Sequence, residues 1–190
     1  MKKDIILAGV GGQGILSIAT VIGEAALKEN LFLKQAEVHG MSQRGGDVQS
    51  NLRISSEPIY SDLIAKGCAD LIISLEPMEA LRYLPYLSED GWIVTNSVPF
   101  INIPNYPEEE KIIAQLKSMK NVILLDVDKL AQEAGNSRAA NIVLLGACSH
   151  LLGIEPEKFE EGIKRIFARK GEEIVDMNIK AFKAGQQAAI

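Results

Sequence analysis

The chain has 190 residues, of which 47% are hydrophobic and 24% are charged, and its formal net charge is −5 at pH 7. This length and composition predict a single globular domain over 1–190 with one good core. The acidic balance argues against a nucleic-acid partner, because phosphate binding needs a concentrated basic face. The densest basic group, at 164–170, is flanked by glutamates, which indicates a solvated helix face.

The N-terminus and the cysteines bear on where the protein works. Asp4 and the glycines that follow interrupt the apolar core of a signal peptide, and the longest apolar stretch, 139–154, is too short to cross a bilayer. We therefore expect a cytoplasmic protein with no membrane contact. Cys68 and Cys148 lie far apart and have no C-x-x-C pattern, so we expect two buried reduced thiols, with no iron–sulfur or other metal site in this chain.

The first element is a short apolar strand that leads into a glycine loop and then a helix. Gly9, Gly11 and Gly14 follow the G-x-G-x-x-G spacing, and helical periodicity continues over 15–27. This is the entry unit of a doubly wound α/β fold, and it aims the positive end of the helix at a loop where an anion can bind. Many α/β proteins use the same spacing only to pack the helix on its strand, so both roles stay open.

The segment 31–38 is predicted to be the second parallel strand. Glu37 lies near its end, about 20 residues past the glycine loop, where dinucleotide-binding domains place the acid that binds a ribose hydroxyl. The run 39–47 has two glycines behind an arginine, which favours a loop over the helix that a dinucleotide half-domain requires. Arg44 would offer its five donors to a phosphate, a carboxylate or a partner's acidic group, and a structural salt bridge is the alternative.

The middle of the chain alternates polar and apolar residues over 48–55, which predicts a half-exposed strand in a hairpin-like edge with a short return at 59–61. The long loop at 97–107 is rich in proline and asparagine and should lie at the carboxyl end of a strand, where ligands or partners of such sheets often bind. The other expected elements are strand 69–75, a helix opening at Pro77, a turn at 89–91, strand 92–95, a helix opening at Pro107 and strand 122–126.

Beyond residue 126 the sequence is wholly helical, with helices expected at 127–134, 137–152, 156–167 and 172–187. Asn141 and His150 lie in the most apolar of these, where a histidine is expected to be a buried core residue. No catalytic residue is predicted, because no serine–histidine–acid set or supported carboxylate pair can be assembled. The overall prediction is a doubly wound, Rossmann-like, mostly parallel α/β sheet with a hairpin-like edge at 1–126 and a helical C-terminal segment at 127–190.

Three segments together resemble one protein family. They are Gly9-Val10-Gly11-Gly12-Gln13-Gly14, then Glu37-Val38-His39-Gly40-Met41-Ser42-Gln43-Arg44-Gly45-Gly46, and finally Asn141-Ile142-Val143-Leu144-Leu145-Gly146. In this order they resemble the gamma-type subunits of the 2-oxoacid:ferredoxin oxidoreductases, most of all the small (beta) subunits of the indolepyruvate enzymes. The resemblance covers essentially the whole chain.

The resemblance implies a multi-subunit enzyme that decarboxylates a 2-oxoacid on thiamine diphosphate with Mg, passes electrons through [4Fe-4S] clusters to ferredoxin, and releases an acyl-CoA. It implies that this chain alone binds none of these cofactors. A large alpha subunit with thiamine diphosphate and ferredoxin-like domains would supply them in an α₂β₂-type assembly, with coenzyme A as co-substrate. The expected substrate is indolepyruvate or another aryl pyruvate, and branched-chain and simple 2-oxoacids stay open.

The glycine loop, the loop at 42–46 and the loop at 97–107 are expected to meet at the carboxyl edge of one sheet and face the partner's cofactor cleft. Residues expected on this ligand- and partner-facing surface are Gly11, Gly12, Gln13, Gly14, Ser42, Gln43, Arg44, Gly45, Gly46 and Asn141. Two other functions stay open. One is a free-standing NAD-binding protein that uses the glycine loop and Glu37, against which the missing helix after Val38 counts. The other is an interaction module that only scaffolds a partner enzyme.

Overall fold

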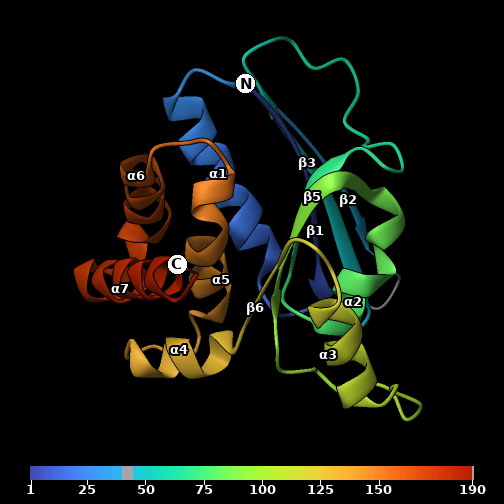
Figure 1. Cartoon of the computed structure of the whole chain (residues 1–190). Coiled ribbons are helices and arrows are strands. Elements are labelled where there is room, and N and C mark those ends of the chain that lie inside the picture. Colours follow the sequence, from blue (N-terminus) through green and yellow to red (C-terminus); the bar gives the residue numbers. More distant parts are fainter. Residues whose placement is uncertain (40–44, 190) are drawn as a thin grey trace.

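A six-stranded sheet organises the computed structural model, which describes residues 1–39 and 45–189 (Figure 1). Strands β1, β4, β5 and β6 run parallel to one another, whereas β3 is antiparallel to both of its neighbours, β1 and β2. The predicted mostly parallel α/β sheet is therefore confirmed. Its order is β2-β3-β1-β4-β5-β6, with β1 at Lys2–Val10, β2 at Phe32–His39, β3 at Asp47–Ser55, β4 at Ala69–Ser74, β5 at Leu87–Asn96 and β6 at Val122–Leu125.

Helices cover both faces of the sheet (Figure 1). One face carries α2 (Pro77–Arg82), followed by a 3-10 turn at Leu84–Tyr86, and α3 (Glu109–Lys117). The opposite face carries α1 (Ile15–Lys28), α4 (Val127–Glu133), α5 (Ala140–Cys148), α6 (Pro156–Phe167) and α7 (Glu172–Ala188), with 3-10 turns at Ser149–Leu151 and Ala168–Lys170. The C-terminal helices thus share one core with the first strand and helix.

Strand β1 is buried on both faces, as its unbroken apolar run requires. Ile5 and Leu7 point into the larger core, which α1, α5, α6 and α7 complete, while Ile6 and Ala8 point into the smaller core under α2 and α3. Successive side chains of a strand alternate between faces, so this single strand joins the two cores. The periodic face predicted for 15–27 is buried in the same way along α1.

Helices α5 and α7 approach each other through two glycines. A Cβ atom placed on Gly146 would lie 2.0 Å from the Phe182 carbonyl oxygen, and one placed on Gly185 would lie 1.9 Å from the Val143 carbonyl oxygen. A methyl group cannot occupy either position, because both obstructing atoms belong to a helix backbone. These glycines therefore set the closest distance between the two helices.

The edge of the sheet differs from the prediction. Strand β2 pairs only with the antiparallel β3, so the expected pairing of 31–38 with a parallel neighbour is wrong. Strand β3 is not at the edge, since it lies between β2 and β1, and on the face expected to be exposed Asn51 is buried while Gln49 and Arg53 are half-buried. The hairpin-like edge exists, but its strands are β2 and β3, and residues 59–61 form no strand. Long-range pairing with β1 buries β3 in a way that its local alternation does not reveal.

Several local predictions also need correction. Residues 89–91 continue β5 instead of turning, next to a register shift where β4 meets β5, and the helix expected from Pro107 begins at Glu109. His150 is exposed, because α5 ends at Cys148 and a 3-10 turn follows it. Cys68 is exposed just before β4, whereas Cys148 is buried, and burial raises the pKa of its thiol. Across 1–39 and 45–189, none of the helices has the length and apolar character of a membrane span.

Candidate functional site

The glycine loop connects β1 to α1 at the carboxyl edge of the sheet. Gly12 and Gly14 have φ angles of 104° and 85°, in a region that residues with side chains rarely adopt. Gly14 is also the N-cap of α1, and it has no side chain that could cap the helix. The amides at the start of α1 and the positive end of its dipole are therefore directed at this loop, which is the arrangement that binds anions.

The turn of the β2–β3 hairpin is attached to the glycine loop by backbone hydrogen bonds. The Gly11 amide donates to the Gly46 carbonyl at 2.8 Å, and the Gly45 amide donates to the Gly11 carbonyl at 3.3 Å. The glycine loop was predicted to meet the loop at 42–46, and Gly45 and Gly46 do contact it. Ser42, Gln43 and Arg44 lie outside the described residues.

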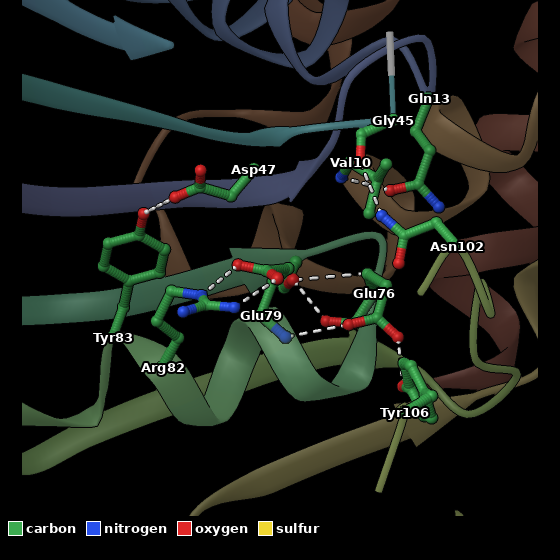
Figure 2. A network of polar contacts seen from close by, with 11 residues as sticks. Val10, Gln13, Gly45, Asp47, Glu76, Glu79, Arg82, Tyr83, Asn102 and Tyr106 are labelled. Carbon is green, nitrogen blue, oxygen red and sulfur yellow. Dashed lines mark hydrogen bonds and ion pairs between the residues drawn. The ribbon is translucent and has the colours of Figure 1, made fainter. Parts of the chain in front are cut away.

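The side chain of Gln13 turns back onto the sheet. Its Oε1 accepts a hydrogen bond from the Val10 amide at 2.7 Å, and its Nε2 donates to the Leu75 carbonyl at 3.2 Å. Figure 2 shows the amide of Gln13 folded over Val10. Gln13 was expected on the ligand-facing surface, but these bonds occupy both of its polar atoms, so it holds the loop to the ends of β1 and β4.

Asn141 brings the C-terminal part of the chain to the glycine loop. Its Nδ2 donates to the Gly14 carbonyl at 3.2 Å, and a Cβ atom on Gly14 would stand 2.8 Å from the same nitrogen. Asn141 lies in the first turn of α5, and that helix is buried through most of its length. The early and late sequence motifs therefore meet at one point, although 127 residues separate them in the chain.

The loop at 97–107 reaches the same edge from the end of β5. Asn102 donates through Nδ2 to the Gly45 carbonyl at 2.6 Å. The Phe100 amide and the Tyr106 hydroxyl both donate to Oε1 of Glu76, at 3.3 and 2.5 Å. Figure 2 shows Asn102 beside Gly45 and Tyr106 beside Glu76. The loop is thus held at three places, and its predicted position at the carboxyl edge is confirmed.

Glu76 is the anchor of this loop and was missed by the sequence analysis. It is fully buried, and its Oε2 also caps α2 by accepting a hydrogen bond from the Glu79 amide at 2.9 Å. The sequence signalled the helix start through Pro77 and Glu79, but glutamate is not a preferred cap residue, so nothing local marked Glu76 as the cap. Burial raises the pKa of Glu76 despite its three donors, and burial together with Glu76 raises the pKa of Tyr106, which therefore stays a hydrogen-bond donor.

We expect Glu76 to make the stability of the fold depend on pH. Its carboxyl has a pKa above the ordinary 4.5 in the folded chain, so the folded state binds the proton more tightly than the unfolded state. Stability from this group is present below the ordinary pKa and is lost as the pH rises through the raised one. The melting temperature of Glu76→Gln, which does not titrate, should therefore improve relative to wild type as the pH rises through this window.

Thermal unfolding at a series of pH values measures this difference. Glu57→Gln is the control, because Glu57 is exposed. A melting-temperature difference between wild type and Glu76→Gln that stays constant over the window would contradict the assignment.

Two further polar contacts lie at the end of α2, and the second of them joins this region to the sheet. Arg82 forms a two-point ion pair with Glu79, at 2.7 and 3.1 Å, and the Tyr83 hydroxyl donates to Asp47 at 3.2 Å (Figure 2). Asp47 begins β3, so the second contact connects the α2 region to the base of the hairpin turn. We interpret both contacts as structural, because they join protein groups to one another.

A hollow of about 390 Å³ lies beside the glycine loop. Its wall is mostly apolar, and the one carboxylate among its lining residues is that of Glu37, which accepts a hydrogen bond from Gln35 at 2.9 Å. Such a site suits a ligand with an anionic part over the loop and a donor group that reaches Glu37. The lining residues are Val10, Gly11, Gly12, Gly14, Ile15, Leu16, Glu37 and Val48.

The dinucleotide-binding arrangement predicted as an alternative is not formed. In that fold, the acid that binds the ribose lies on the parallel strand next to β1. Here β3 separates β2 from β1, so Glu37 approaches the hollow from two strands away. Within the described ranges, no group of three or more His, Cys, Asp or Glu residues could hold a metal ion.

Comparison with known proteins gives consistent matches over the whole chain. The family model described as pyruvate ferredoxin/flavodoxin oxidoreductase matches residues 4–188. The indolepyruvate oxidoreductase subunit IorB of Pyrococcus horikoshii is 40% identical, over 100% of this chain and 97% of that protein.

Solved structures share the fold. The gamma subunit of a keto/oxoacid ferredoxin oxidoreductase from Geobacter sulfurreducens is 26% identical, with a TM-score of 0.73 over 98% of both chains. A 2-oxoglutarate:ferredoxin oxidoreductase from Magnetococcus marinus, described with 2-oxoglutarate, coenzyme A and succinyl-CoA bound, is 24% identical with a TM-score of 0.78. The match covers 99% of this chain and 31% of that one, so this chain spans about a third of that longer polypeptide.

Proposed function

This chain belongs to the pyruvate ferredoxin/flavodoxin oxidoreductase family, and we propose that it is the small, gamma-type subunit of an indolepyruvate:ferredoxin oxidoreductase. The complete enzyme would convert indolepyruvate or a related aryl pyruvate and coenzyme A into the acyl-CoA and CO₂, and pass the electron pair to ferredoxin. The observation that carries the substrate class is the 40% identity, over the full chain, to a relative named as an indolepyruvate oxidoreductase subunit.

We assign thiamine diphosphate, Mg and the [4Fe-4S] clusters to a large alpha subunit that also contacts ferredoxin, in a cytoplasmic α₂β₂-type complex. The donor set of this chain supports that division, because a [4Fe-4S] cluster is held by four thiolates. The chain has two cysteines, of which Cys148 is buried and Cys68 is exposed. Thiamine diphosphate, when bound to the partner, supplies the carbanion chemistry of decarboxylation.

We assign to this chain the binding of an anionic part of coenzyme A at the glycine loop. The support is geometric: the start of α1 is open to an anion, Asn141 fixes the Gly14 carbonyl, and the apolar hollow continues from the loop to Glu37. The Glu37 carboxylate could accept a hydrogen bond from an amino or hydroxyl group of the nucleotide. We also assign Ser42, Gln43 and Arg44 to the proposed surface on the basis of the sequence, and Arg44 would supply a cation.

The test is co-expression with the large subunit, followed by 2-oxoacid-dependent reduction of a viologen dye in the presence of coenzyme A. Indolepyruvate, phenylpyruvate, 2-oxoisovalerate and pyruvate are compared, with and without this chain. We expect activity only when both chains are present, with indolepyruvate as the best substrate. A chain that neither associates with the large subunit nor changes its activity, but is stabilised by NAD, would refute the proposal.

A further inference from the structure

The loop at 97–107 exposes a cluster of apolar side chains. Val98, Phe100, Ile101 and Ile103 are 40%, 48%, 68% and 37% exposed. The whole segment contains no Asp, Glu, Lys or Arg, although 24% of the chain is charged. Gathered apolar groups on a soluble protein mark contact surfaces, and the cores of protein interfaces are depleted in charge and enriched in aromatic residues.

Prolines and hydrogen bonds to the sheet also restrain this loop. Pro99, Pro104 and Pro107 restrict its backbone, and the bonds from Phe100 and Tyr106 to the buried Glu76 fix it to the sheet. A surface that is already ordered loses little conformational entropy on docking, so more of its contact energy appears as affinity. The exposed side chains therefore lie on a restrained backbone, which favours binding to a partner.

We propose that the 97–107 loop is the surface on which the large partner subunit docks, through an uncharged apolar patch centred on Phe100 and Ile101. This inference rests on the proposed function, because the large subunit is the partner that the proposed function assigns to this chain. Two observations favour this occupant. The fold of this chain occupies 31% of a longer oxidoreductase polypeptide, whose remainder is tethered to it. The Asn102–Gly45 hydrogen bond also joins the loop to the glycine-loop edge, where the proposed function places coenzyme A shared with this partner.

The chain offers a matched control surface at the opposite end of the sheet. Tyr60 and Leu63 are 92% and 59% exposed in the segment that follows β3. Ser55, the last residue of β3, pairs with Lys2 at the start of β1, so the segment that follows lies at the amino-terminal end of the parallel strands. Figure 1 shows this segment at the other end of the sheet from the start of α1. An apolar group here has similar exposure but no connection to the glycine loop.

The experiment compares Ile101→Asp with Leu63→Asp by measuring the affinity of each purified variant for the large subunit. Both changes place a negative charge at an exposed apolar position, and melting temperatures show that each variant is folded. We expect Ile101→Asp to weaken the association by about tenfold or more and Leu63→Asp to change it by less than about threefold. Phe100→Ser, a second change in the same patch, should also weaken it.

The outcomes separate this inference from the proposed function. If wild type, Ile101→Asp and Leu63→Asp all bind the large subunit equally, the docking surface is wrong while the proposed function stands. If wild-type chain does not bind the large subunit at all, both are wrong. If Ile101→Asp instead breaks a self-association seen by analytical ultracentrifugation, and leaves the affinity for the large subunit unchanged, the patch binds a second copy and the inference is overturned.

Discussion

Replacing Gly185 by alanine is expected to destabilise the protein by about 3 kcal/mol or more, at the upper end of what overpacking costs. The new Cβ atom would stand 1.9 Å from the Val143 carbonyl oxygen and 2.9 Å from the Ala147 amide nitrogen. Because both atoms belong to the backbone of α5, no rotamer change can make room, and α7 must move away from α5. Chemical denaturation measures the loss, and the melting temperature should fall by roughly 10 °C.

Gly23→Ala is the matched control for this change. Gly23 is also a buried helix residue, in α1, but a Cβ atom there would meet only the end of the Leu33 side chain, at 3.4 Å. The same substitution should be neutral or stabilise by up to about 1 kcal/mol, since alanine favours a helix interior. If the denaturation midpoints of both variants equal that of the wild type, the close crossing of α5 and α7 is wrong.

Replacing Asn141 by aspartate is expected to raise the KM for coenzyme A of the assembled enzyme by about tenfold or more. The change removes the Nδ2 donor to the Gly14 carbonyl and places a carboxylate against that oxygen. It also brings negative charge to the helix end that is proposed to bind an anion, which adds repulsion of about 1 kcal/mol or more. Steady-state kinetics with coenzyme A as the varied substrate measures the effect.

Asn136→Asp controls for the added charge. The Asn136 side chain accepts a hydrogen bond from the Arg138 amide, which an aspartate accepts equally well. Asn136→Asp should leave the KM for coenzyme A unchanged, and both variants should still bind the large subunit. Equal KM values in the two variants would show that coenzyme A does not bind at the glycine loop. They would favour a subunit that only scaffolds its partner.

Elements with strong local signals were predictable from the sequence. Helix α6 has the bounds expected from its periodicity and its opening proline, and α2 begins at Pro77 as expected. Gly135 and Gly153 follow α4 and the 3-10 turn after α5 with positive φ angles, which glycine adopts without strain. In each case, the residues that determine the element lie within the element or next to it.

Features that depend on distant parts of the chain were not predictable in this way. Nothing in the alternation of 48–55 shows that β3 lies between β2 and β1, because strand order is decided by long-range pairing. The contact of Asn102 with Gly45 spans 57 residues and leaves no pattern in the sequence. Asn141 was expected on the same surface as the glycine loop, but its contact with Gly14 was not predicted. The capping role of Glu76 was not predictable either, because glutamate is not a preferred cap residue.

The two faces of the sheet are completed at different times as the ribosome delivers the chain. The core beneath α2 and α3 is formed by residues up to Leu124, so it can close while the last third of the protein is still being made. The core beneath α1 also needs Phe159 and Ile163 from α6 and Phe182 from α7. The nascent protein therefore carries a finished side and an open apolar side until its final helices emerge, and that open side is what chaperones would encounter during synthesis.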